Sequence, residues 1–303
     1  MSHSKTEHLR GLESYLRSQV IGQDDAISRV SRALEASECG LNDTGPRPRG
    51  AFLFMGPTGV GKTSCCKAFN EHLLGSSRLT MLYMNEMQSP NDVGDLVRTI
   101  KLGVEAHPNG TTFLFDEIEK AHRAIIDVFL SLLDEGQVTA PDGERISVCN
   151  CYVVMTSNIG AQRWTQMEQT TYSVMESFAY DQARKILRPE LFNRLTETVV
   201  FRPLSQETQI GILNQMLGKK LMHVEVTLEK IFGTLPSPLS IDEKSVNAHL
   251  LRKGFTQTGG ARRLRQELDR QFNIATMPWI FSGQVPQECR FFYDAKNDRL
   301  ELR

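Results

Sequence analysis

Five short runs of consecutive apolar residues constrain the fold of this 303-residue chain most strongly. They occupy residues 51–55 (AFLFM), 81–84 (MLYM), 111–115 (TTFLF), 151–155 (CYVVM) and 198–201 (TVVF). A strand that is buried on both faces of a parallel sheet needs such a run, and the segments between the runs are long enough for crossover helices. We therefore predict an α/β fold with a mostly parallel sheet flanked by helices, in which ligands bind at the carboxyl ends of the strands.

The pattern changes after Pro203, where helix follows helix over 205–226, 241–254 and 261–281. At the end of the chain, two alternating apolar runs, RFFYD and RLELR, surround the polar turn AKND, which is typical of a β-hairpin. Two amphipathic segments, 7–20 and 23–39, precede the first strand. We predict a large α/β domain over 1–203 and a small, mostly helical domain over 204–303 that ends in the hairpin.

A glycine-rich segment, GPTGVGKT (56–63), lies between the first apolar run and a helix-forming run over 63–74, and it fits the pattern G-x-x-x-x-G-K-[ST]. Glycines let such a loop wrap around phosphate oxygens, with backbone N–H groups pointing inward at the positive end of a helix. Lys62 would reach the β- and γ-phosphate oxygens, and the Thr63 hydroxyl would bind Mg²⁺. The alternative is a glycine-rich turn that only caps a helix. The candidate nucleotide-binding residues in this loop are Pro57, Thr58, Gly59, Val60, Gly61, Lys62 and Thr63.

Two carboxylates, Asp116 and Glu117, follow the apolar run 111–115 directly. An acidic residue next to a buried strand is costly unless it has a partner or a task. Asp116 is placed to hold Mg²⁺, and Glu117 to orient and polarise an attacking water. The alternative is that both residues only favour the N-terminus of a following helix over 120–133 through its dipole.

The composition excludes several classes of protein. The chain has 35 Lys and Arg against 36 Asp and Glu, a net charge of −1, so no overall field attracts a polyanion and we expect no nucleic-acid partner. No apolar run approaches the roughly 20 residues of a membrane-spanning helix, and the start of the sequence lacks the apolar stretch of a secretory signal. The six cysteines include no CxxC pair, so we expect free thiols. These observations predict a soluble, cytoplasmic protein without membrane insertion.

Seven segments together resemble the Clp family of AAA+ ATPases, specifically the C-terminal ATPase module of ClpA- and ClpB-type unfoldases. They are VIGQDDAI (20–27), GPTGVGKT (56–63), LFDEIEKAH (114–122), LLDEGQVT (132–139), VVMTSN (153–158), LRPELFNR (187–194) and GGAR (259–262). The segments occur in the family's order and at compatible separations. This resemblance covers nearly the whole chain and implies a P-loop AAA+ module followed by a small helical lid domain.

The same resemblance implies roles for five further residues. Val20 and Ile21 would border the adenine. Asn158 would be the first sensor, whose amide helps to place the water against the γ-phosphate; the alternative is a polar strand end. Arg194 would be an arginine finger acting in the neighbouring subunit's site, and its alternative is a surface salt bridge. Arg262 would be the second sensor, reaching the nucleotide from the helical domain. A finger that acts in trans implies a homo-oligomer, which in this family is a ring hexamer.

The chain departs from the family in the segments that face the pore. The family carries an aromatic-glycine loop, typically G-Y-V-G, whereas residues 84–112 and the second pore-facing segment, 136–147, contain no Phe, Tyr or Trp. Apolar contact with a substrate is left to Leu102, Val104 or Val138, which we expect to be core residues instead. No I-G-F or L-G-F tripeptide lies in 161–185, so no ClpP-type peptidase is expected as a partner.

Taken together, these features predict a Mg-ATP-binding and hydrolysing ATPase that remodels or disassembles a protein substrate or complex. ATP and Mg²⁺ are the expected cofactors. The catalytic candidates are Lys62, Glu117, Asn158, Arg194 and Arg262. The alternative, favoured by the missing aromatic loop, is an ATP-dependent switch or loader that orders an assembly without threading a polypeptide. A third class, nucleic-acid remodelling, is disfavoured by the balanced charge.

Overall fold

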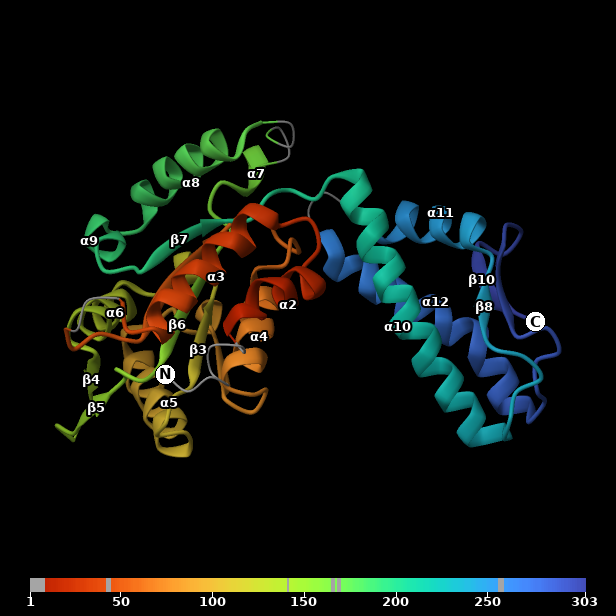
Figure 1. Cartoon of the computed structure of the whole chain (residues 1–303), viewed down its shortest axis with the longest axis horizontal. Helices are drawn as coiled ribbons and strands as arrows, with labels where there is room; N and C mark the ends of the chain where they lie inside the picture. The colour runs from red at the N-terminus through yellow and green to blue at the C-terminus, as the bar shows by residue number, and fades with distance from the viewer. Residues whose placement is uncertain (1–8, 42–44, 141, 165–166, 168–169, 256–258) are drawn as a thin grey trace. The chain divides into compact units, whose positions relative to one another are not determined.

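Two units, Met1–Pro203 and Leu204–Arg303, make up the chain, and we call them unit 1 and unit 2. The structure, a computed structural model, describes residues 9–41, 45–140, 142–164, 167, 170–255 and 259–303 (Figure 1). The first two residues of the predicted amphipathic segment 7–20 lie outside these ranges.

Unit 1 is built on a five-stranded sheet with the order β2-β3-β6-β1-β7. Its strands are β1 (Gly50–Met55), β2 (Leu79–Tyr83), β3 (Thr112–Asp116), β6 (Tyr152–Ser157) and β7 (Glu197–Val200). All four pairings are parallel, which confirms the predicted sheet. The ends of each predicted run lie within two residues of the ends of its strand; β2 begins two residues earlier than predicted, and Met84 begins a 3₁₀ turn instead of ending β2.

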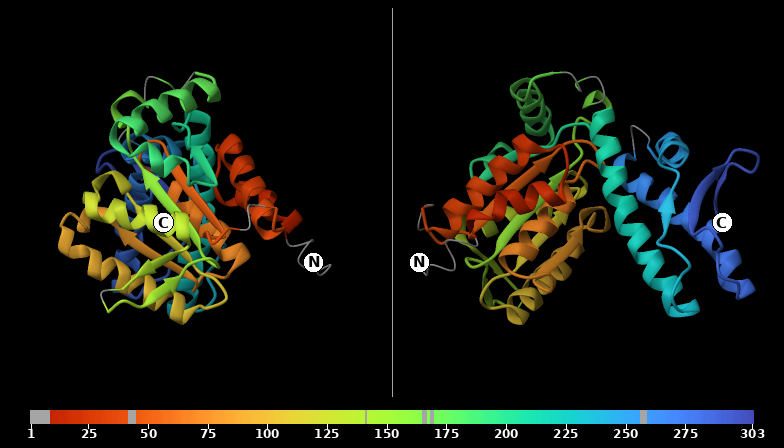
Figure 2. Two further views of the ribbon diagram at one scale, coloured as in Figure 1. Left: turned by 90° about the vertical axis from the view of Figure 1, so that its left-hand side faces the viewer. Right: turned by 45° about the vertical axis from the view of Figure 1, so that its right-hand side comes forward.

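Helices cover both faces of this sheet (Figure 2). On one face lie α2 (Leu12–Gln19), α3 (Asp24–Glu38) and α4 (Lys62–Leu73), and Phe69 of α4 packs with its ring centroid 6.2 Å from that of Phe52 on β1. The other face carries α5 (Val93–Ala106), α6 (Arg123–Glu135) and α8 (Tyr172–Ile186), whose apolar side chains share a buried cluster with Leu53 and Met55. Because side chains alternate along β1, one continuously apolar strand supplies both layers.

The connections of unit 1 hold shorter elements. They are η1 (Met84–Glu86), η2 (Pro90–Asp92), η3 (Ile118–Lys120), α7 (Ala161–Trp164), α9 (Pro189–Phe192) and an antiparallel hairpin of β4 (Gln137–Thr139) and β5 (Arg145–Ser147). Val138 is buried and Val104 packs against the core, as expected. The expectation for Leu102 is wrong, because its side chain is 60% exposed on the outer face of α5.

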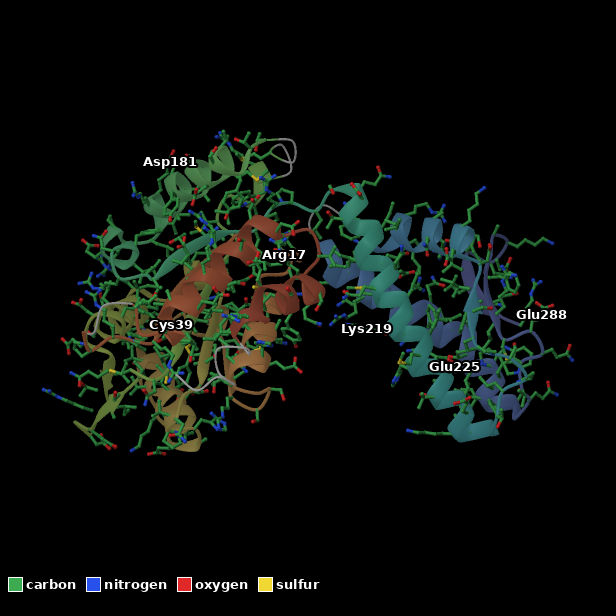
Figure 3. The ribbon with its side chains drawn as sticks, in the orientation of Figure 1. Arg17, Cys39, Asp181, Lys219, Glu225 and Glu288 are labelled. Atoms are coloured by element: carbon green, nitrogen blue, oxygen red, sulfur yellow. The ribbon has the colours of Figure 1, made fainter. Side chains whose placement is uncertain are left out.

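The exposure of the charged side chains and the state of the thiols agree with what the composition predicts. Charged side chains such as Arg17, Asp181 and Lys219 lie on the outer faces of α2, α8 and α10 (Gln206–Phe232) (Figure 3). Each of the six cysteines, all within the described ranges, is a thiol outside any disulfide, and burial raises the pKa of the Cys65 thiol to about 12. In the part of the chain that the structure describes, no helix combines the length and the apolar character needed to cross a bilayer.

Unit 2 packs three helices against a small sheet. The helices are α10 (Gln206–Phe232), α11 (Glu243–Gly254) and α12 (Gly260–Ser282), and the sheet has the order β10-β9-β8. The predicted hairpin is present as β9 (Arg290–Asp294) and β10 (Arg299–Leu302), which pair antiparallel. A third strand, β8 (Ser240–Ile241), pairs parallel with β9; at two residues it is too short for a sequence pattern to reveal.

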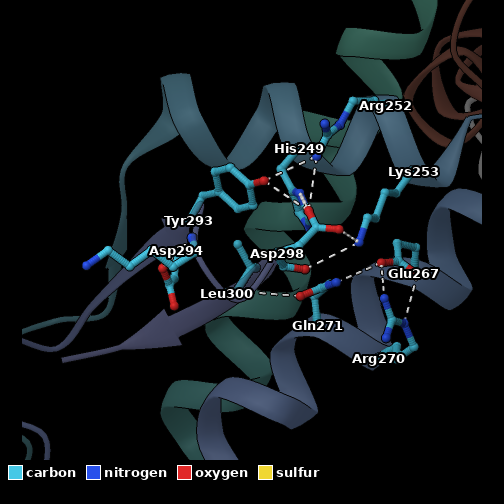
Figure 4. A network of polar contacts seen from close by, with 11 residues as sticks. His249, Arg252, Lys253, Glu267, Arg270, Gln271, Tyr293, Asp294, Asp298 and Leu300 are labelled. Carbon is cyan, nitrogen blue, oxygen red and sulfur yellow. Dashed lines mark hydrogen bonds and ion pairs between the residues drawn. The ribbon is translucent and has the colours of Figure 1, made fainter.

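A polar cluster on unit 2 surrounds the carboxylate of Asp298 in the hairpin turn (Figure 4). Asp298 Oδ1 accepts hydrogen bonds from the Tyr293 hydroxyl at 2.9 Å and from Arg252 Nη2 at 3.1 Å, and Lys253 pairs with the same carboxylate. His249 lies beneath this cluster, 2% exposed, with its ring centroid 4.2 Å from that of Tyr293. Burial, together with the charges of Lys253 and Arg252, lowers the pKa of His249 below 6.5, although Asp298 and Glu267 act in the opposite direction.

We predict that unit 2 loses stability as the pH falls below 6.5. In that range His249 of the unfolded chain binds a proton that the folded state excludes, so the free energy of unfolding decreases. The His249→Phe variant keeps an aromatic ring against Tyr293 and should lack this part of the pH dependence. Urea unfolding of the full chain between pH 5 and pH 8 measures it, in a Trp164→Phe background that leaves Trp279 as the fluorescent reporter. The same pH slope in both proteins would contradict the prediction.

Candidate functional site

The loop 56–61 leaves β1 at the carboxyl edge of the sheet and leads into α4. Gly56, Gly59 and Gly61 have φ angles of 143°, 76° and 110°, which side-chain-bearing residues rarely adopt. At Gly56 an added Cβ would lie 2.4 Å from the Phe201 carbonyl oxygen, so that position also lacks room for a side chain. Pro57 and Val60 are buried, whereas Thr58 and Gly59 are half-buried. The loop therefore wraps as the glycine pattern predicts.

Lys62, the first residue of α4, points back into this loop. Its Nζ donates hydrogen bonds to the carbonyl oxygens of Gly56 at 2.7 Å and Pro57 at 2.6 Å, and to Asn158 Oδ1 at 2.8 Å. The side chain is only 6% exposed. Carbonyl and amide oxygens accept these three bonds, and they hold the side chain at the N-terminus of α4, where the helix dipole favours an anion.

The two carboxylate residues are held by one side chain on the neighbouring strand. Asp116 ends β3, and its Oδ1 accepts a hydrogen bond from the Thr156 hydroxyl at 2.6 Å. The backbone N–H of Glu117 donates to the same hydroxyl at 3.1 Å. Glu117 has φ 60° and ψ 55°, a left-handed conformation that costs about 1 to 3 kcal/mol in a residue other than glycine. The left-handed conformation of Glu117 turns the chain sharply at the end of β3, and α6 does not begin until Arg123.

Asn158 connects the phosphate loop with the acidic strand end. Its Oδ1 accepts from Lys62, and its Nδ2 donates to Glu117 Oε1 at 2.8 Å. The backbone N–H of Asn158 donates to Glu119 Oε1 at 3.0 Å, which fixes the end of β6. The structure thus brings together Lys62, Asn158 and Glu117, which the sequence places 96 and 41 residues apart.

The segment 20–23 packs against the phosphate loop. Val20 is buried, and its Cγ1 would lie 2.8 Å from a Cβ on Gly61, while Ile21 is half-buried. Gln23 was missed in the sequence analysis: its Nε2 donates to Val60 O at 3.1 Å and to Arg202 O at 2.9 Å, and its Oε1 accepts from Arg202 N at 2.9 Å. One buried amide therefore fixes the phosphate loop to the end of β7. Its place within the VIGQDDAI segment is the only sequence signal for this contact.

Arg194 follows α9 and contacts α6 in its own chain. Its Nη1 donates to Glu190 O at 2.8 Å, and its Nη2 lies 3.2 Å from Asp134 Oδ2. The side chain is 25% exposed. A second ion pair, Arg188 with Asp127, fastens the start of the same segment to α6. The carboxylate of Asp134 thus holds Arg194, the candidate arginine finger, near the surface. This ion pair is the salt bridge that the sequence analysis gave as the alternative role of Arg194.

Arg262 lies in unit 2, in the first turn of α12, and its side chain is exposed. The exposed positions beside it, Arg263 and Arg265, give this helix end a basic surface.

Thr63 and Asp116 provide the oxygen donors that a magnesium ion prefers. Thr63 is the second residue of α4 and Asp116 the last of β3, and both side chains are half-buried. Mg²⁺ is usually bound in proteins through one or two carboxylates together with substrate phosphates and water. A hydroxyl and a carboxylate beside a phosphate-type loop fit that chemistry.

Comparison with known proteins identifies the family. The sequence profile described as AAA domain (Cdc48 subfamily) matches residues 47–198, half of the chain. Among curated proteins, the chloroplastic chaperone protein ClpD2 of Oryza sativa subsp. japonica is 34% identical over 304 residues, covering 91% of this chain and 31% of the relative. Chaperone protein ClpB of Helicobacter hepaticus is 31% identical over 317 residues, covering 99% of this chain and 35% of the relative. The chain thus spans about a third of the length of these relatives.

Solved structures of Hsp104 are similar over the full chain. A closed-state cryo-EM reconstruction of Hsp104 with ATPγS and FITC casein superposes with a TM-score of 0.83 at 26% identity, covering all of this chain and 52% of that one. The Saccharomyces cerevisiae Hsp104–ADP complex gives a TM-score of 0.82, also at 26% identity, and covers 99% and 53%. With its parallel sheet, its phosphate-type loop and the residues gathered at the sheet edge, the chain belongs to the AAA domain family and, within it, is similar to the Clp chaperones.

Proposed function

We propose that the chain binds and hydrolyses Mg-ATP at the carboxyl edge of the unit 1 sheet. The observation that carries the proposal is the chain of hydrogen bonds from Lys62 through Asn158 to Glu117. It supports the proposal because one amide links an ammonium that would bind phosphate to a carboxylate that would act as the base. Phosphoryl transfer depends mainly on positioning and on charge stabilisation, and these groups supply both.

Each group has a distinct task in this proposal. Lys62 stabilises negative charge on the β- and γ-phosphate oxygens, and Glu117 accepts a proton from the attacking water through its carboxylate. Asn158 orients that water with its amide. Thr63 and Asp116 would hold Mg²⁺, which neutralises phosphate charge when it is bound. Val20 and Ile21 lie on the loop side of the site, where we place the adenine.

The site is completed by a second copy of the chain in this proposal. Arg194 would leave Asp134 and stabilise transition-state charge in a neighbouring subunit, within a cytoplasmic ring hexamer. Arg262 would sense the nucleotide from unit 2. The Arg194 side chain is 25% exposed, which supports its availability to a partner.

We further propose that ATP hydrolysis drives remodelling of a protein substrate. Similarity to chaperones named ClpB and ClpD, and to an Hsp104 complex that contains casein, supports this function. The absence of aromatic residues from 84–112 favours the second candidate, an ATP-dependent switch or loader. In the remodelling function, exposed Leu102 offers an apolar contact within that segment.

We predict that Arg194→Ala lowers the turnover number for ATP by about three orders of magnitude or more while ATP affinity is retained. Arg188→Ala serves as the matched control, because it removes a comparable ion pair with α6 at the other end of the same segment. Steady-state phosphate release and ATP titration measure the two effects. Equal losses in both variants would assign the effect to docking of the segment on α6, and unchanged turnover in Arg194→Ala would show that no neighbour completes the site.

We predict that casein, an unfolded protein, raises the ATPase rate of the purified chain, whereas single-stranded DNA and RNA do not. The rate should vanish in Glu117→Gln, which keeps ATP binding because the phosphate loop and Lys62 are unchanged. Phosphate release with each addition measures this. Stimulation by nucleic acid would contradict a protein substrate, and a rate that responds to none of them would favour the switch or loader.

A further inference from the structure

The Thr156 hydroxyl touches both carboxylate residues of the site. Thr156 lies on β6, is 1% exposed, and follows Met155, which is in register with Phe115 of β3. Its Oγ1 donates to Asp116 Oδ1 at 2.6 Å and accepts from the backbone N–H of Glu117 at 3.1 Å. One buried hydroxyl on one strand therefore contacts two successive residues at the end of the next.

These two bonds need a group that donates and accepts at the same time. A carboxylate oxygen can only accept and a backbone N–H can only donate, so the atom between them must do both, as a hydroxyl does. The bond to the N–H also supports the left-handed backbone of Glu117. A valine of the same shape would leave the Glu117 N–H and an Asp116 carboxylate oxygen without these partners.

We propose that Thr156 is a positioning residue, which fixes the metal-binding carboxylate of Asp116 and the water-activating carboxylate of Glu117 in one geometry. This inference rests on the proposed ATPase function and adds a residue to which the sequence analysis gave no role. Thr156 acts through the carboxylate of Asp116 and the backbone of Glu117; Lys62 and the phosphate loop are held by other bonds.

The division of contacts makes the proposal specific. Glu117 is held at its backbone by Thr156 and at its side chain by Asn158, so loss of the hydroxyl releases only one of the two supports. Lys62 keeps its bonds to Gly56, Pro57 and Asn158 in that case. Catalysis and the response to Mg²⁺ should therefore suffer, while Mg²⁺-free nucleotide binding should not.

The experiment compares Thr156→Val, Thr156→Ser and the matched control Thr112→Val. Thr112 is a fully buried threonine on β3, and its hydroxyl has no hydrogen-bond partner among the described residues. We expect Thr156→Val to lower the turnover number about 100-fold, the size of effect that a misplacement of about 1 Å produces. It should also reduce the gain in ATP affinity that Mg²⁺ provides, and leave the dissociation constant of ATP measured in EDTA within about twofold of wild type. Thr156→Ser should recover most of the loss, and Thr112→Val should behave as wild type.

Three results would overturn the proposal. The first is wild-type turnover and Mg²⁺ response in Thr156→Val. The second is an equal loss in Thr156→Ser, which would assign the effect to packing of the methyl group. The third is loss of ATP binding in EDTA by Thr156→Val, which would indicate general damage to the site. If Thr156→Val does not fold, Thr156→Cys takes its place with the same expectation, because a thiol donates only weakly. A wild-type chain that binds ATP without hydrolysing it would refute the proposed function, and with it this inference. Hydrolysis by wild type with an unaffected Thr156→Val would refute the inference alone.

Discussion

The amide of Asn158 is the contact on which the site depends, because it links the phosphate loop to the acidic strand end. It accepts from Lys62 Nζ and donates to Glu117 Oε1, each at 2.8 Å. One planar amide that makes both bonds holds the ammonium and the carboxylate on opposite sides of itself at a fixed separation. The bond from its backbone N–H to Glu119 then fixes the amide to the loop that carries Glu117. Binding of a phosphate and activation of a water are thereby tied to the same local geometry.

Parallel pairing of the strands makes this geometry available. In the register of β1 with β6, Met55 pairs with Ser157, so the phosphate loop and Asn158 begin at the same level of the sheet. On the other side of β6, Phe115 pairs with Met155, which brings Asp116 and Glu117 to that level as well. Every residue of β1 and β6 is buried, so the functional loops extend from a packed apolar layer. Rigid elements of this kind hold reactive groups more accurately than free loops do.

The sequence was sufficient for features that depend on local patterns and insufficient for those that depend on neighbours across the fold. Continuous apolar runs predicted the five parallel strands, and the glycines of 56–61 predicted the shape of the loop. Thr156 and Gln23 received no role, because a threonine in a strand and a glutamine before a helix are ordinary until their partners are known. Leu102 was expected in the core, but its side chain is 60% exposed, because packing decides which face of a helix is buried. The ion pair of Arg194 with Asp134 likewise depends on α9 docking against α6, which no local pattern specifies.

Calorimetric titration of Mg-ATP into three forms of the full chain tests most directly whether this loop is the nucleotide site. Wild type should bind ATP, and Lys62→Ala should lose measurable binding, because the buried ammonium that the loop carbonyls and Asn158 hold in place is gone. The matched control Lys67→Ala, an exposed lysine on the same helix, should bind as wild type does. Tight ATP binding by Lys62→Ala would contradict the central claim, because the nucleotide would then be bound without the group around which the loop is built.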